Sequence, residues 1–340
     1  MTHVPITVVG FGVAGQFLLS YICTYFHKPA TFISVIDPDF LGGDLQRHYH
    51  SVTSNTTIQQ AIDALSTLPP MWSQVSASLL EKGSPTSTLS LGTLASELQT
   101  LGRSLLPRCT CVYDTVSRAQ WDEMGKRWIL SLASGSVYTT DILCLCSGIA
   151  PRQEDYGIPL IPLYKALDVS SLRRIVRNGD KVCVLGTSHS GTLALKNLHE
   201  ISGVQTTCIH RGPFKYARDG HRAGIKEESA KIADSIQAGE YTNLTLVPST
   251  ELHLVSKAFR GSSWLIQATG FQASIVPCFD PSGAQYSLHW DPVTGKSLSM
   301  ESVYAFGACV PNEHGDVSLG AFVEQLQTRW PPLLERLKSI

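Results

Sequence analysis

A glycine-rich turn near the start of the chain has the spacing of a dinucleotide-binding site. Gly10, Gly12 and Gly15 form a G-x-G-x-x-G pattern between two apolar runs, which predict a strand and a helix. Such glycines allow a tight turn and close approach to a pyrophosphate, and the helix start offers free N–H groups to the phosphates. Asp37 ends the next apolar run, where a carboxylate can accept hydrogen bonds from a ribose. The alternative is an ordinary α/β turn. We predict a dinucleotide site made by Gly10, Gly12, Val13, Ala14, Gly15 and Asp37.

A second unit of this kind occurs in the middle of the chain. Gly186, Ser188, Ser190 and Gly191 form a turn between an apolar strand and a helical segment, with Ser188 where a glycine would be usual. Serine is small and can donate to a phosphate, so the turn still suits an anion. The next predicted strand is followed by Arg211, a cation that suits the 2′-phosphate of NADPH better than NADH. The alternative is a surface arginine at the end of a strand.

Other residues near the two turns could also act on a bound molecule. Gly42 and Gly43 mark a loop where the backbone passes close to something bulky. His48 and His50 could act as acid or base there, although half-buried loop histidines are a common alternative. His189, within the second turn, could touch a phosphate or be a plain loop residue.

Several other kinds of chemistry find no support in the sequence. The eleven histidines are scattered and no C-x-x-C or H-x-x-x-H spacing occurs, so no metal site is expected. No G-x-S-x-G occurs, which argues against a hydrolase. The nine cysteines form no even framework and are expected to be small buried residues in a reducing compartment.

The composition is that of a globular protein of about two domains. The 340 residues include 43% hydrophobic residues, and the net charge is −1. Lysine and arginine are scattered, so we expect a small-molecule substrate rather than a nucleic acid. The first apolar segment lacks a basic region before it, and no membrane span is expected. A cytoplasmic protein is predicted, and a homo-oligomer is left open.

The strand–turn–helix–strand organisation therefore occurs twice, with the second copy inserted into the first. This predicts an α/β fold with two nested Rossmann-like domains, residues 1–160 with 273–340 and residues 161–272. A small antiparallel β meander is expected from strands at 109–116, 128–133 and 137–138. We further expect helices over 58–65, 89–106 and 226–238, a loop over 68–87 and a strand at 252–256.

Two nested dinucleotide folds are the arrangement of the two-domain flavoproteins. Within that group the chain resembles the flavin-containing monooxygenases and their N-hydroxylating and Baeyer–Villiger relatives. The matches are the first turn with Asp37, the pair Gly42 and Gly43, residues 49–56, the end of the second turn, and residues 268–271. Departures are the missing F-x-G-x-x-x-H-S motif, alanine rather than aspartate after Gly307, and a short chain.

The resemblance implies FAD on the first turn and NADPH on the second. Gly42, Gly43, Gly148 and Gly307 would lie by FAD, and Thr269 and Gly270 would close the nicotinamide domain. Asn55 would lie against the flavin edge and the nicotinamide, where its amide could hydrogen-bond a flavin C4a-(hydro)peroxide. The alternative is that Asn55 caps the helix that follows it.

Three functions remain open from the sequence. The first is an FAD- and NADPH-dependent monooxygenase that oxidises a small organic substrate at nitrogen, sulfur or carbon. The second is a flavin-dependent reductase, oxidase or cyclase of the same fold without oxygen insertion. The third is a nucleotide-binding redox sensor without catalysis.

Overall fold

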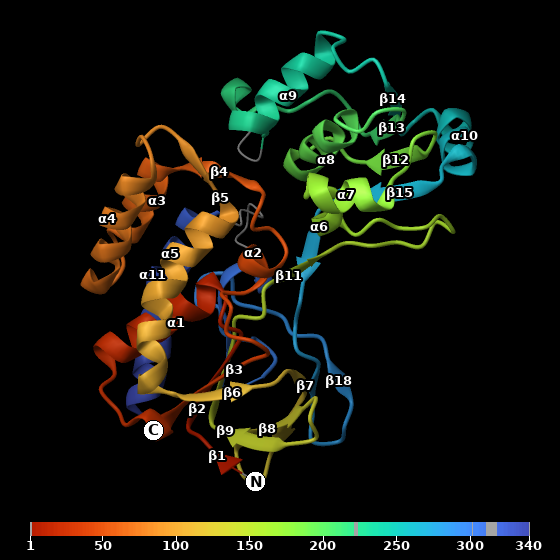
Figure 1. Ribbon diagram of the computed structural model, residues 1–340. Helices are drawn as coiled ribbons and strands as arrows, with labels where there is room; N and C mark the ends of the chain where they lie inside the picture. The colour runs from red at the N-terminus through yellow and green to blue at the C-terminus, as the bar shows by residue number, and fades with distance from the viewer. Residues whose placement is uncertain (1, 221–223, 301, 311–317, 340) are drawn as a thin grey trace. The chain divides into compact units, whose positions relative to one another are not determined.

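Contacts within the computed structural model divide the chain into two compact units. The structure describes residues 2–220, 224–300, 302–310 and 318–339. Unit 1 comprises Met1–His50, Thr56–Ile149 and Ala273–Ile340, and unit 2 comprises Ser51–Asn55 and Ala150–Gln272 (Figure 1). Unit 2 thus begins before the predicted boundary at residue 160, and it includes a short segment from the first part of the chain. The assignment of one cofactor to each unit remains a prediction.

Unit 1 is built on a parallel sheet of five strands in the order β19-β10-β2-β3-β6. The strands are β2 (Ile6–Val9), β3 (Ile33–Asp37), β6 (Thr110–Tyr113), β10 (Ile142–Leu145) and β19 (Val303–Ala305). All but β6 are buried throughout, as their continuous apolar sequences require in a sheet covered on both faces. The first four of these strands in the chain, β2, β3, β6 and β10, lie in the spatial order β6-β3-β2-β10, which is the 3-2-1-4 order of a Rossmann half.

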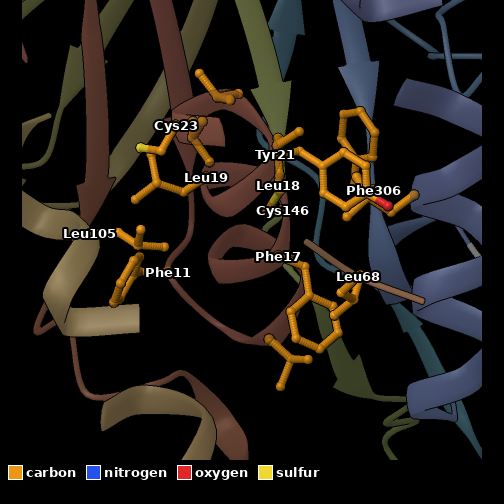
Figure 2. Close-up of a cluster of buried hydrophobic side chains, with 14 of the residues drawn as sticks. Phe11, Phe17, Leu18, Leu19, Tyr21, Cys23, Leu68, Leu105, Cys146 and Phe306 are labelled. Atoms are coloured by element: carbon orange, nitrogen blue, oxygen red, sulfur yellow. The ribbon is translucent and has the colours of Figure 1, made fainter. Parts of the chain in front are cut away.

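Helices cover one face of this sheet and share one core. They are α1 (Val13–Tyr25), α3 (Ile58–Leu65), α4 (Ser73–Lys82), α5 (Leu91–Leu105) and α11 (Leu319–Lys338). Helix α1 is buried along most of its length, and Figure 2 shows Phe11 and Leu105 on one side of it and Leu68 and Phe306 on the other. This packing fixes the start of α1, which carries the first glycine-rich turn.

The meander covers the other face of the sheet and differs from the prediction in its first strand. It consists of β7 (Val116–Asp122), β8 (Arg127–Leu132) and β9 (Val137–Thr140), all antiparallel. Its sheet has the order β1-β9-β8-β7-β17-β18, with β1 (Thr2–His3), β17 (Cys278–Phe279) and β18 (Gln285–Tyr286). The predicted strand at 109–116 was wrong as a meander strand: β6 pairs with β3 in the parallel sheet, and the chain turns before β7.

Unit 2 contains a second parallel sheet, in the order β14-β13-β12-β15. Its strands are β12 (Lys181–Leu185), β13 (Gln205–His210), β14 (Leu244–Pro248) and β15 (Trp264–Gln267), and its helices are α6 (Leu163–Ala166), α7 (Val169–Ile175), α8 (His189–His199), α9 (Glu227–Gln237) and α10 (Leu252–Gly261). The predicted strand at 252–256 is part of α10. Val255, Ala258 and Phe259 of α10 pack against the sheet core at helical spacing.

Shorter elements complete the described chain. They are α2 (Asp44–Arg47), β4 (Thr53–Thr57), β5 (Thr88–Ser90), β11 (Ile149–Pro151), β16 (Phe271–Ala273) and the 3-10 turns Ala30–Phe32, Pro70–Trp72, Leu106–Arg108, Ala217–Asp219 and Gly307–Cys309. The predicted loop over 68–87 was wrong, because α4 occupies its centre and buries Val75 and Leu79. Among the described residues, no helix is long and apolar enough to cross a membrane.

Candidate functional site

Both glycine-rich turns bring backbone so close to backbone that only glycine fits. A Cβ atom at Gly15 would lie 2.0 Å from the carbonyl oxygen of Gly10, and one at Gly191 would lie 2.2 Å from that of Gly186. Gly10 and Gly186 both have positive φ, at 98° and 103°. Each helix therefore starts directly against the strand before it, as a dinucleotide turn requires.

The helices after these turns begin without a side-chain cap. The N-cap of α1 is Gly12, which has no side chain, and the N-cap of α8 is Ser188, whose side chain makes no cap hydrogen bond. The first turn of each helix also contains no acidic residue. A side chain caps α3, α5, α7 and α11, whereas α2, α4, α6, α9 and α10 also lack a side-chain cap. The glycine-rich turn before the helix is therefore what distinguishes α1 and α8. The first N–H groups of α1, from Val13 and Ala14, and those of α8, which include Ser190, are thus free of a side-chain cap and suited to an anion.

Asp37 lies where the sequence predicts it, but its carboxylate already binds the backbone around it. One oxygen accepts from Phe11 N at 2.7 Å, and the other accepts from Asp39 N at 3.1 Å and Phe40 N at 2.8 Å. A carboxylate offers about four acceptor sites, so about one remains for a ribose hydroxyl. Asp37 therefore first holds the turn and the loop in place.

The structure brings several of the other predicted FAD residues to the start of α1. A Cβ atom at Gly43 would lie 3.0 Å from Gly12 Cα, and one at Gly307 would lie 2.5 Å from Ala14 Cβ. A Cβ atom at Gly42 would make only ordinary contacts, with Gln99 and Gln16, whereas Gly148 faces open space. Beside Gly148, the buried hydroxyl of Ser147 has no hydrogen-bond partner. These close backbone approaches and the orphaned hydroxyl fit a bound dinucleotide.

The predicted nicotinamide residues follow β13 and β15, the two strands that flank β12 in the sheet of unit 2. Arg211 directly follows β13 and is exposed, and no hydrogen bond or ion pair of its side chain occurs within the described part of the chain. Thr269 and Gly270 follow β15; Thr269 is exposed and Gly270 has φ of 100°. All three lie after the carboxyl ends of parallel strands, where ligands of α/β sheets bind.

His189 forms a cluster that no sequence pattern indicates. Its Nδ1 meets the hydroxyl of Ser229, and the ring also hydrogen-bonds the backbone of Thr53, in the segment of unit 2 that comes from early in the chain. Thr53 in addition bonds the side chain of Glu228, which accepts from Lys196 Nζ at 2.8 Å. Burial lowers the pKa of His189, against the opposing effects of Thr53 and Glu228. These partners lie far apart in the sequence, so no local pattern could have revealed them.

The predicted catalytic residues lie on or near β4. Asn55 is half-buried within β4, and its capping interpretation is wrong: Thr57 is the N-cap of α3 and forms a capping box with Gln60. His48 is half-buried, with Nε2 3.9 Å from Asp44 Oδ1. His50 is exposed, and its carbonyl accepts from Gly92 N at 3.0 Å. A chemical role for these three side chains remains a prediction.

The potential metal ligands are dispersed over the described part of the chain, and the cysteines are mostly buried. Within the described ranges, no group of three or more metal-ligating side chains could hold an ion. All nine cysteines are free, and eight are buried. Burial raises the pKa of the Cys183 and Cys208 thiols to about 12, so neither is a thiolate at neutral pH.

Comparison with known proteins supports the resemblance that the motifs carry. No family model matches the chain. A curated relative, monooxygenase AgnR1 of Paecilomyces divaricatus, is 27% identical over 333 residues, which cover 85% of this chain and 84% of the relative.

Solved structures of similar fold cover nearly the whole chain. A flavin-containing monooxygenase from Stenotrophomonas maltophilia has a TM-score of 0.64 at 15% identity and covers 100% of this chain and 99% of its own. A bacillithiol disulfide reductase from Staphylococcus aureus has a TM-score of 0.64 at 11% identity, with 99% of both chains covered. A complex of OTEMO with FAD and NADP has a TM-score of 0.64 at 12% identity and covers 99% of this chain and 85% of its own. The chain therefore has the FAD- and NAD(P)-binding fold of the flavoprotein monooxygenases, which confirms the predicted fold.

Proposed function

We propose that the chain is an FAD- and NADPH-dependent monooxygenase that acts on a small organic substrate. The observation that carries this proposal is the pair of turns in which only glycine fits, each leading from a strand of its own parallel sheet into a helix without a side-chain cap. Two dinucleotide sites in one chain suit transfer of electrons from one nucleotide to the other. The name of the curated relative, a monooxygenase, and the FAD and NADP of the OTEMO complex support this function.

The residues of each unit have separate roles in this proposal. In unit 1 the N–H groups at Val13 and Ala14 bind the pyrophosphate of FAD, and Asp37 accepts one ribose hydroxyl. In unit 2 the start of α8 binds the NADPH pyrophosphate, and Arg211 binds the 2′-phosphate. The amide of Asn55 would hydrogen-bond the reacting oxygen.

The cofactors supply the oxidation chemistry. FAD held at the start of α1 and NADPH held at the start of α8 would supply hydride transfer and activation of dioxygen, so that, with a proton from solvent, one oxygen atom enters the substrate at nitrogen, sulfur or carbon and the other leaves as water. The protein excludes water and orients the reactants.

The second candidate is a flavin-dependent oxidoreductase without oxygen insertion. The bacillithiol disulfide reductase favours it, since its TM-score equals that of the flavin-containing monooxygenase. A dithiol mechanism in this chain is disfavoured, because no C-x-x-C occurs and the cysteines are mostly buried.

Isotopically labelled dioxygen distinguishes the two candidates. Purified protein would be given FAD, NADPH and labelled dioxygen with a panel of small amines, thioethers and ketones, and products analysed by mass spectrometry. We expect one labelled oxygen atom in a product. Hydrogen peroxide as the only oxygen product across the panel, or a substrate reduced without label, would favour the second candidate.

A matched pair of variants tests whether turnover requires the second glycine-rich turn. Gly191→Ala places a Cβ atom against the Gly186 carbonyl and should abolish NADPH-driven turnover while FAD stays bound. Gly261→Ala, whose Cβ atom meets nothing within 4 Å, should behave like the unmodified protein.

A further inference from the structure

An exposed aromatic ring stands at the carboxyl edge of the unit 1 sheet. Tyr113 is the last residue of β6, and its side chain is 68% exposed. In the parallel pairing of β3 with β6, Tyr113 lies directly beside Asp37. The carboxyl ends of parallel strands are where ligands of α/β sheets bind, so this exposed ring stands where a bound dinucleotide could reach it.

The ring of Phe40 packs against the ring of Tyr113. The Phe40 and Tyr113 ring centroids are 4.6 Å apart, and Phe40 in turn lies 5.3 Å from Phe11 of the first glycine-rich turn. The three rings therefore run from the pyrophosphate turn toward the end of β6. Their planes are tilted rather than parallel, by 56° between Phe40 and Tyr113.

The backbone of Phe40 is held in a conformation that most side chains avoid. Its φ is 54°, in the left-handed region. The N–H of Phe40 donates to Asp37 at 2.8 Å, and its carbonyl accepts from Gln99 Nε2 at 2.7 Å. Strain of this kind concentrates at ligand sites, so the position of the Phe40 ring is itself a constrained feature of the site.

The order of the strands places the adenine near Tyr113. The pyrophosphate of a bound dinucleotide lies at the start of α1, after β2, and the adenosine ribose lies at Asp37, at the end of β3. The adenine extends beyond the ribose, and the next strand of the sheet is β6. Neighbouring strands are about 4.8 Å apart, so an adenine that extends past the ribose at β3 comes close to the Tyr113 ring at β6.

Asp37 has about one acceptor site left for the adenosine, and that site can reach the ribose but does not hold the base. Three of its roughly four acceptor sites are occupied by the backbone N–H groups of Phe11, Asp39 and Phe40. We propose that Tyr113, backed by Phe40, is the aromatic platform on which the adenine of FAD stacks. This inference rests on the proposed function, because it requires FAD to be the cofactor of unit 1.

Binding measurements on the flavin-free full-length protein test this role. Affinity for FAD would be measured by quenching of flavin fluorescence, and affinity for ADP by competition with FAD. Tyr113→Ala should weaken both by about 5- to 100-fold, the range seen for loss of one base–aromatic stack. Tyr113→Phe keeps the ring and should bind FAD as the unmodified protein does. FMN, which lacks adenine, should bind Tyr113→Ala and the unmodified protein equally.

Tyr25→Ala is the matched control. Tyr25 ends α1 and is 51% exposed, and its ring makes tilted contacts with Tyr21 and Trp330, so its loss also removes an exposed aromatic contact. It should leave FAD affinity unchanged, and thermal unfolding of each flavin-free variant would verify folding.

Each contrary outcome has a distinct meaning. Undiminished FAD affinity in Tyr113→Ala would overturn the stacking role while leaving the proposed function intact. Equal weakening of FMN and FAD would show a general disturbance of the site, which also overturns it. A protein that binds no FAD in its unmodified form would overturn the proposed function and the stacking role together.

Discussion

The glycines of the two turns are the residues whose roles could be predicted best from the sequence. Gly15 and Gly191 are required because a Cβ atom would collide with a carbonyl oxygen of the same turn. Such a requirement depends only on neighbours in the chain, so it appears as a spacing pattern. The partners of Asp37 could not be predicted in the same way, since its position indicates a ribose contact but not three backbone donors.

Arg211 should determine the choice of nicotinamide cofactor. A hydrogen-bonded charge pair with the 2′-phosphate contributes about 1.5–3 kcal/mol, so Arg211→Gln should lower the preference for NADPH over NADH by about 10- to 100-fold. The measurement is kcat/KM for flavin reduction with each nucleotide.

The control for Arg211 is another exposed arginine of unit 2. Arg260→Gln, on α10, should leave the preference unchanged. Equal loss of NADPH and NADH affinity in Arg211→Gln would contradict a contact with the 2′-phosphate, since NADH lacks that group.

Among the elements, those with strong periodicity were predicted and those decided by packing partners were not. Helix α3 occupies the predicted residues 58–65, and α5 and α9 lie within their predicted ranges. Strand β6 was assigned to the wrong sheet, because a short strand gives no sign of which strand it pairs with. Helix α10 was predicted as a strand because its apolar residues begin close together, before the helical spacing becomes visible.

Because Thr57 and not Asn55 caps α3, substitutions at the two residues should have different effects. Thr57 Oγ1 accepts from Gln60 N at 3.3 Å, and Gln60 Oε1 accepts from Thr57 N at 3.0 Å. Thr57→Ala should therefore lower the free energy of unfolding by about 1 kcal/mol. Asn55→Ala should change it by less than about 0.5 kcal/mol, yet should divert NADPH oxidation from product to hydrogen peroxide. Urea unfolding and product-to-NADPH ratios measure the two effects; a destabilised Asn55→Ala with unchanged coupling would contradict this division.

His189 should make the stability of the protein fall in mild acid. Burial lowers its pKa from the ordinary value of about 6.5, so the unfolded chain takes up a proton at higher pH than the folded one. The free energy of unfolding should therefore decrease as pH falls below about 6.5, until the pH passes the folded pKa. Burial of Glu228 acts to raise its pKa, but the hydrogen bond and charge of Lys196 outweigh this effect and lower the pKa. Glu228 therefore stays ionised over the pH range in which His189 changes the stability.

Unfolding curves between about pH 8 and pH 5 measure this dependence. His189→Asn cannot titrate and should lose less stability across the range than the unmodified protein. His253→Asn, at an exposed position on α10, should follow the unmodified protein. Identical slopes for His189→Asn and the unmodified protein would show that His189 does not titrate differently on folding.

At the scale of the whole molecule, the nested order of the two dinucleotide units was readable because each unit repeats the same local sequence of elements. The membership of residues 51–55 in unit 2 was not, since it depends on contacts of Thr53 with His189 and Glu228 more than a hundred residues later. The substrate is likewise not encoded in any pattern of the turns. Nucleotide sites share a residue spacing because all of them bind phosphates. Substrates share no such group, so a substrate site has no common spacing by which to recognise it.

One chain should bind FAD, and NADPH should reduce that FAD. The direct measurement is the visible spectrum of the purified protein, recorded without oxygen during titration with NADPH. We expect one FAD per chain, bleached by one equivalent of NADPH, and colour restored on admission of oxygen. A protein that takes up no FAD, or whose bound FAD is not bleached by NADPH, would contradict it.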